Sequence, residues 1–70
     1  MTPLLPALTD REEQVLLLLA EGHGPREIAL RMGIAPSTVR GYRDTARGKL
    51  GAATTTQAVA ILVRFRVEVG

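Results

Sequence analysis

The sequence predicts an all-α fold, a single domain of four helices, and three observations lead to this prediction. Apolar residues recur at helical spacing in four segments of the 70-residue chain. Thr, Pro and Gly stand at the ends of these segments, where they start or stop helices. The chain has no cysteine, so aliphatic side chains must build the core, and 46% of the residues are hydrophobic.

The first helix is expected over residues 9–21. Thr9 and Glu12 form a capping-box sequence, in which the hydroxyl accepts from a backbone N–H and the carboxylate reaches back. The stripe that should face the core consists of Val15, Leu16, Leu18 and Leu19. Leu17 falls on the opposite side of this helix, where a polar residue is expected.

The second and third helices are expected over residues 25–32 and 36–50. Pro25 and Pro36 suit the first turn of a helix, where the missing N–H would have no partner anyway. Gly33 suits the left-handed residue that ends the second helix. The expected core faces are Ile28, Ala29 and Met32, followed by Val39, Tyr42, Ala46 and Leu50. Two helices joined by a tight, Gly-containing turn form a helix-turn-helix, which therefore stands at the centre of the domain.

The fourth helix is expected over residues 54–66, starting at a second capping box formed by Thr54 and Gln57. Its core face should carry Ala58, Ile61, Leu62 and Phe65, and an apolar strip on its other sides consists of Val59, Val63 and Val67. This strip is either a homodimer interface or a set of scattered surface aliphatics. Residues 1–7 are expected to form an extended N-terminal arm, and the domain is expected to span residues 8–70.

Charge is distributed unevenly along the chain, whose net charge is +2. Residues 36–50 hold four basic residues and one acid, a balance of +3, whereas residues 10–22 hold four acids and one arginine. A basic block on one helix is typical of a nucleic-acid-binding surface. The alternative from charge alone is a solvated charged face.

Other classes of function have little support in the sequence. The single histidine, His23, lies beside glycines, and no Gly-rich phosphate loop or metal-ligand spacing occurs. We therefore expect no enzyme, no cofactor and no metal. The longest apolar runs have six residues, whereas a membrane-spanning helix needs about 20. No signal peptide is recognisable, so we expect a cytoplasmic protein.

Residues 8–66 resemble the LuxR/NarL/FixJ-type (GerE-like) DNA-binding domain. The order and spacing of several short motifs carry the resemblance, among them Leu8-Thr9-x-Arg11-Glu12, Glu27-Ile28-Ala29, Thr38-Val39-Arg40 and Lys49-Leu50-Gly51. The resemblance implies sequence-specific binding of double-stranded DNA by a transcriptional regulator. It also implies that helix 36–50 enters the major groove and that helix 54–66 forms a homodimer interface. RNA polymerase is a further candidate partner, and the domain resembles the output domain of a response regulator.

The resemblance also assigns candidate DNA contacts. Arg40 occupies a basic position that contacts DNA in the family, and its guanidinium suits bidentate binding of guanine. Thr38 and Arg26 are phosphate candidates, and Arg43 is expected either to reach a phosphate or to pair with an acid of the first helix. The full candidate set is Arg26, Ser37, Thr38, Arg40, Gly41, Arg43, Asp44, Arg47 and Lys49.

Two residues depart from the family pattern within the third helix. Gly41 replaces a larger side chain, and Asp44 replaces a polar or basic one. We hypothesise that Gly41 and Gly48 allow a closer approach to DNA, and that Asp44 accepts from a cytosine amine or orients Arg40 or Arg47. The alternative is a frayed helix of weak specificity, because each interior glycine costs about 1 kcal/mol relative to alanine.

Two other functions remain open on the sequence. Region 4 of a bacterial sigma factor is a related helix-turn-helix that binds promoter DNA and RNA polymerase, and Ala46-Arg47 resembles its recognition helix. A protein-interaction module that no longer binds DNA is suggested by Asp44, the two glycines and an exposed Leu17. The sequence also leaves open whether this is the output domain of a longer regulator or a naturally short one.

Overall fold

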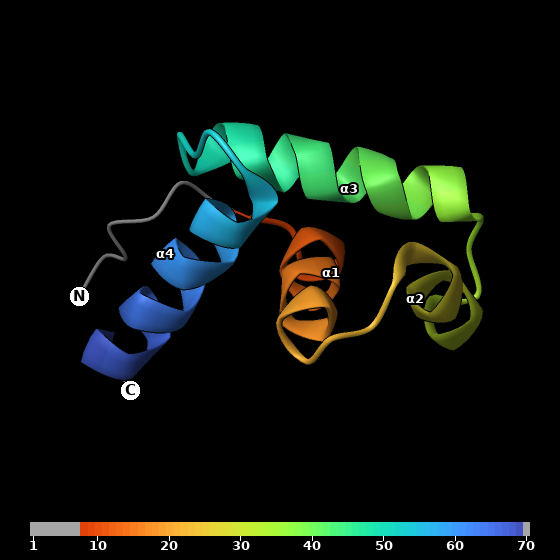
Figure 1. Cartoon of the computed structure of the whole chain (residues 1–70), viewed down its shortest axis with the longest axis horizontal. Coiled ribbons are helices and arrows are strands. Elements are labelled where there is room, and N and C mark those ends of the chain that lie inside the picture. The colour runs from red at the N-terminus through yellow and green to blue at the C-terminus, as the bar shows by residue number, and fades with distance from the viewer. Residues whose placement is uncertain (1–7, 70) are drawn as a thin grey trace.

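The computed structural model describes residues 8–69, which form four helices and no strand. They are α1 (Asp10–Ala20), α2 (Pro25–Met32), α3 (Pro36–Lys49) and α4 (Thr55–Val69). This confirms the all-α, four-helix prediction. In Figure 1, α3 lies across the top of α1 and α2, and α4 lies on the other side of α1 from α2. The arm expected at residues 1–7 and the side chains of residues 66–69 lie outside the description.

The start of α1 is the predicted capping box. The backbone N–H of Glu12 donates to Thr9 Oγ1 at 3.1 Å, and the N–H of Thr9 donates to Glu12 Oε1 at 2.8 Å. Two N–H groups that the helix leaves without partners are thereby satisfied. Thr9 is the cap rather than the first helical residue, so α1 begins at Asp10.

The helix-turn-helix consists of α2, a tight turn and α3. Gly33 ends α2 with a φ of 69°, a left-handed conformation that glycine adopts without steric penalty. The N–H of Ile34 closes the turn by donating to the carbonyl of Ala29 at 3.0 Å. Ile28 and Val39 are buried together with Val15 of α1, so the helix pair is fastened to the rest of the domain.

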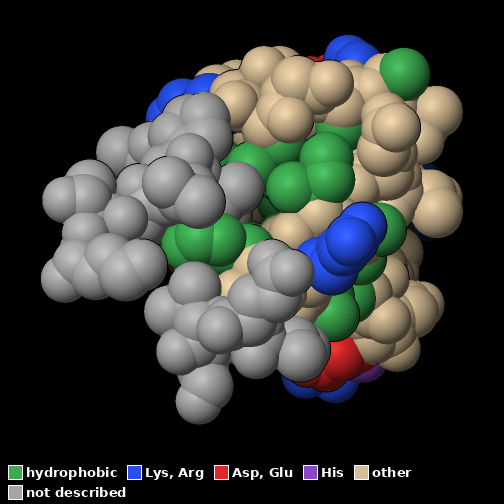
Figure 2. All heavy atoms as spheres, turned by 90° about the vertical axis from the view of Figure 1, so that its left-hand side faces the viewer, with side chains coloured by type: hydrophobic (Ala, Val, Ile, Leu, Met, Phe, Trp, Pro, Cys, Tyr) green, Lys and Arg blue, Asp and Glu red, His purple; other side chains and the backbone are tan. Residues whose placement is uncertain are grey.

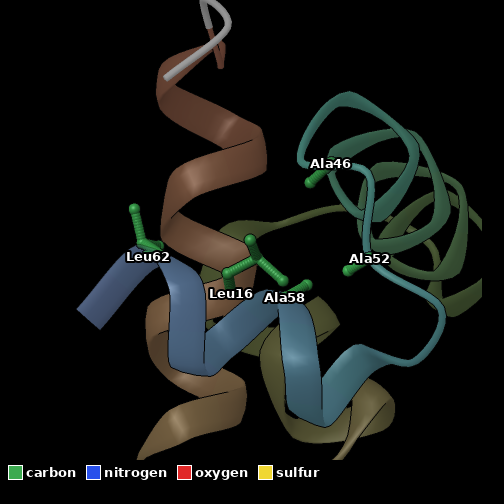
Figure 3. Packing of buried hydrophobic residues seen from close by; sticks show 5 residues of the cluster. All are labelled: Leu16, Ala46, Ala52, Ala58 and Leu62. Atoms are coloured by element: carbon green, nitrogen blue, oxygen red, sulfur yellow. The ribbon is translucent and has the colours of Figure 1, made fainter. Parts of the chain in front are cut away.

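A second cluster joins α1, α3 and α4. Its buried members are Leu16, Ala46, Ala52, Ala58 and Leu62, and Figure 3 shows Leu16 of α1 directed towards Ala58 of α4. Three of the five are alanines, so the helices can approach one another closely. Leu17 packs half-buried against this cluster. The prediction that Leu17 is exposed was therefore wrong, because α4 covers a side of α1 that the pattern of α1 alone marks as solvent-facing.

The start of α4 differs in detail from the predicted capping box. Thr54 Oγ1 accepts from the N–H of Gln57 at 3.1 Å, as expected. Gln57 Oε1 accepts from the N–H of Ala53 at 2.6 Å rather than from Thr54. The helix then continues to Val69, beyond the expected end at residue 66.

Leu30 of α2 is an exposed apolar side chain that the sequence analysis did not single out. It is 85% exposed, while its neighbour Ala29 is buried against α3. The helical phase set by Ile28, Ala29 and Met32 would have placed it outward.

Within residues 8–69, no helix is long and apolar enough to cross a membrane.

Candidate nucleic-acid interface

The outer side of α3 is the candidate interface. Val39 and Ala46 are buried against the core, and Tyr42 packs partly against it. In Figure 1 no other helix lies beyond α3 on its outer side. We call its exposed residues the exposed face of α3: Ser37, Thr38, Arg40, Gly41, Asp44, Thr45 and Gly48. Five of these seven residues belong to the predicted DNA-binding set. Gly48 is the second glycine expected to allow a close approach to DNA, and Thr45 was not predicted.

Thr45 was missed by the sequence analysis. It is exposed and lies one turn after Gly41, so it borders the same face. Its position in the helical phase of α3 was the available signal. A threonine there offers a hydroxyl and a methyl group, both of which base edges can contact.

The first turns of both helices of the helix-turn-helix lack a side-chain cap. Gly24 precedes α2 and Ala35 precedes α3, and neither supplies a side-chain acceptor. Backbone N–H groups at a helix start, together with the helix dipole, favour a bound anion. Ser37 and Thr38 are exposed in the first turn of α3, and Arg26 is exposed in the first turn of α2.

Arg40 and Arg26 are exposed, and neither forms a hydrogen bond or an ion pair with the described side chains or backbone. Their guanidinium groups are therefore available to a ligand without breaking an internal contact. Both belong to the predicted set of DNA contacts.

Arg43 and Asp44 form an ion pair on α3 itself. Arg43 Nε donates to Asp44 Oδ1 at 3.1 Å, and the two side chains are 29% and 53% exposed. Arg43 therefore does not pair with an acid of α1, and that alternative was wrong. Asp44 contacts Arg43 rather than Arg40 or Arg47, so the idea that it orients either of those two is not what the structure shows.

Arg47 and Lys49 make contacts inside the domain. Arg47 Nη1 lies 3.4 Å from the carbonyl oxygens of both Ala52 and Ala53, in the loop that leads to α4. Lys49 Nζ lies 2.8 Å from Glu12 Oε1, and Glu12 is only 3% exposed. A stabilising role accounts for both positions, and DNA contact by either side chain stays a prediction.

The pKa of Glu12 reflects this environment. Burial by itself raises the pKa of the carboxyl, but hydrogen bonds from Lys49 and from the backbone and hydroxyl of Thr9 outweigh burial and lower it below the ordinary value. The carboxylate is thus held in its charged form, joining the start of α1 to the end of α3.

The two glycines of α3 are not required by the domain's own packing. A β-carbon at Gly41 or Gly48 would meet no atom within 4 Å, and neither residue has a positive φ. Neither backbone conformation nor internal crowding therefore explains a glycine at these positions. A close approach by something outside the domain remains as a physical reason.

We expect Gly41→Ala to raise the free energy of unfolding by about 1 kcal/mol, because alanine has the higher helix propensity. If DNA approaches the backbone there, the added methyl group should also weaken binding. Thermal unfolding and fluorescence anisotropy with a bound duplex measure the two effects. Gly48→Ala is the parallel variant, seven residues later on the same face of α3. Unchanged or tighter DNA binding by both variants would contradict a close approach of DNA to the α3 backbone.

The predicted dimer residues on α4 differ in environment. Val63 is 41% exposed, whereas Val59 is half-buried and packs against the cluster around Leu16. Val59 therefore contributes to the core of its own domain, and the side chain of Val67 lies outside the described residues. Figure 2, which views the α4 side of the molecule, shows hydrophobic side chains at the surface there.

The fold and this interface define a helix-turn-helix domain whose third helix has one face exposed. The chain matches the model of the luxR family of bacterial regulatory proteins over residues 6–62. It belongs to that family.

Curated relatives agree with this assignment. The chain is 41% identical over 60 residues to the spore germination protein GerE of Bacillus subtilis, covering 86% of this chain and 81% of GerE. It is 42% identical over 53 residues to a probable HTH-type transcriptional regulator, GfsR, of Streptomyces halstedii, covering 76% of this chain. The chain spans only 22% of GfsR.

Solved structures agree as well. The dimer of Vibrio cholerae VqmA, a LuxR-type receptor studied in the absence of its target DNA, has a TM-score of 0.77 and 40% sequence identity over 90% of this chain. A second VqmA structure has a TM-score of 0.75 and 42% identity. The match covers 28% of the VqmA chain in each case.

Proposed function

We propose that this domain binds double-stranded DNA sequence-specifically as part of a transcriptional regulator, with α3 in the major groove. The observation that carries the proposal is the exposed face of α3, where Arg40 has no internal partner within the described residues. A major groove about 12 Å wide admits one α-helix. The domain then acts by binding rather than by catalysis, and in the cytoplasm, where bacterial DNA is located.

The contacts divide by chemistry. Arg40 is proposed to bind base edges. A guanidinium offers two parallel donors to guanine, and Arg40 carries the guanidinium on the exposed face of α3. Arg26, Ser37 and Thr38 are proposed to bind phosphates, because they lie in first turns of helices, where anions are favoured. Gly41 has no side chain and is proposed to let the backbone of α3 approach the DNA closely.

The salt dependence of binding tests the proposal. Fluorescence anisotropy should give an affinity for duplex DNA that falls steeply between about 50 and 200 mM salt, because phosphate contacts release counterions. Selection from a pool of random duplexes should enrich a defined sequence. Neither enrichment nor salt dependence is expected of a protein-interaction module, so their joint absence would favour that alternative.

Membership of the luxR family removes the main reason for considering region 4 of a sigma factor. Contact with RNA polymerase stays a prediction, since no feature of the described surface identifies the polymerase as a partner.

We further propose that α4 forms a homodimer on DNA through the exposed side of Val63. A two-fold dimer would match paired half-sites. We expect Val63→Glu to weaken dimerisation and binding to a two-half-site duplex, while single-half-site binding is retained. Ala53→Glu adds the same charge in the α3–α4 loop and is the control. Sedimentation with and without DNA measures association, and an unchanged association state for Val63→Glu would contradict this interface.

A further inference from the structure

Asp44 is an acid in the middle of the surface proposed to meet DNA. Phosphates repel a carboxylate, so an acid at this place weakens binding unless it finds a donor. Along a helix, the neighbours of a side chain are three and four residues away. For Asp44 these are Arg40, Gly41, Arg47 and Gly48. Neither arginine pairs with Asp44, and the two glycines have no side chain that could cover the carboxylate.

Arg43 holds one oxygen of this carboxylate. Its Nε donates to Oδ1 at 3.1 Å, which offsets the negative charge and restricts the side chain. Within the described part of the chain, Oδ2 has no hydrogen-bond partner. Asp44 is 53% exposed, so Oδ2 is accessible as an acceptor.

The donors available in the major groove are few. Cytosine presents its N4 amine and adenine its N6 amine, whereas guanine presents two acceptors and thymine an acceptor and a methyl group. An ionised carboxylate is an acceptor only. It is attracted to the two amines and repelled by the guanine and thymine oxygens. Adenine also carries the N7 acceptor next to its amine, which repels the carboxylate, whereas cytosine does not.

We propose that Asp44 is a specificity-determining residue that selects cytosine through Oδ2, with Arg43 positioning and neutralising the carboxylate. This proposal rests on the proposed function and goes beyond it by naming the base. Arg40 precedes Asp44 by one turn, about 6 Å along the helix. Base pairs are spaced about 3.4 Å apart. Where the helix follows the groove, the bases contacted by Arg40 and Asp44 are therefore expected to lie about two base-pair steps apart.

Selection of bound duplexes from a random pool tests the proposal. For the unaltered protein we expect one position at which cytosine is favoured about 10-fold over guanine and thymine, the size of one good base contact. Asp44→Asn should shift that position towards adenine, because an amide supplies both a donor and an acceptor to adenine N6 and N7. Asp44→Ala should make that position indifferent and leave the other positions unchanged.

Asp10→Asn is the matched control, since it removes the same charge from an exposed position on α1. It should tighten binding to all duplexes slightly and keep the cytosine preference. Asp44→Asn and Asp44→Ala could instead tighten binding to all duplexes slightly and keep the cytosine preference, as the control does. If they do so while the unaltered protein still selects a sequence, the cytosine contact is overturned and the proposed function stands. If the unaltered protein selects no sequence, both are overturned. Circular dichroism confirms that each variant is folded.

Discussion

Arg40→Ala is expected to weaken binding to the selected duplex about 10- to 100-fold and to relax the preference at one base pair, since a bidentate base contact contributes about 1–3 kcal/mol. The side chain is exposed and has no partner in the described part of the domain, so the domain's stability should change little. Fluorescence anisotropy with the selected duplex measures the loss of affinity. The same measurement with duplexes altered at single base pairs measures the change in base preference.

Arg26→Ala is the comparison for this prediction. As a phosphate contact on α2, Arg26 should contribute equally to all sequences, so its loss should weaken binding uniformly and reduce the salt slope by about one. If Arg40→Ala shows the same uniform pattern, then Arg40 also contacts phosphate rather than a base.

Lys49→Met is expected to lower the free energy of unfolding by about 2 kcal/mol, the usual scale for a hydrogen bond to a charged group. Its ammonium donates to the buried Glu12 carboxylate at 2.8 Å, and methionine keeps the apolar stem but leaves that charge without its partner. A domain of this size has a total stability on the order of 5 kcal/mol, so the loss is large. Urea denaturation measures it.

Glu12→Gln is the complementary variant, because glutamine can still serve in the capping box with Thr9 but lacks the charge. A double-mutant cycle of Glu12→Gln and Lys49→Met then isolates the ion pair, and we expect a coupling energy of about 1 kcal/mol at neutral pH. A coupling close to zero would show that capping alone explains the position of Glu12.

The lowered pKa of Glu12 gives this coupling a pH dependence. A carboxyl whose pKa is lower in the folded than in the unfolded state stabilises the fold above the unfolded value, and this contribution is lost as pH falls through the folded value. The ordinary value is 4.5. The wild-type protein should therefore lose stability below about pH 4.5, and Glu12→Gln should lose less over the same range.

Local signals in the sequence correctly predicted the helix starts and turns. The hydroxyl of Thr9 and the carboxylate of Glu12 bond as the capping box requires, and Gly33 adopts the left-handed conformation expected of it. These contacts span only a few residues, so their chemistry is present wherever the local sequence is. Gln57 differs, because its side chain accepts from the N–H of Ala53, one residue before the expected partner Thr54.

Long-range partners of charged side chains could not be predicted in the same way. Glu12 and Lys49 are 37 residues apart, and only the packing of α1 against α3 brings them together. Arg43, Arg47 and Lys49 are basic residues of one helix, and the sequence did not identify the internal partner of any of them. Their different partners depend on which side of α3 faces the core, the loop or solvent.

Periodicity, caps and family motifs are local in the chain, so they were enough to predict the class of fold, the four helices and the helix-turn-helix. They also made Arg40 a candidate base contact. The remaining features arise from the packing of the helices. In the folded domain Leu17 and Val59 are partly buried, and Lys49 contacts Glu12. Asp44 pairs with Arg43 through one carboxylate oxygen and leaves the other exposed. Whether a side chain belongs to the core or to the interface depends on which other helix covers it, and that information arises only when the helices pack.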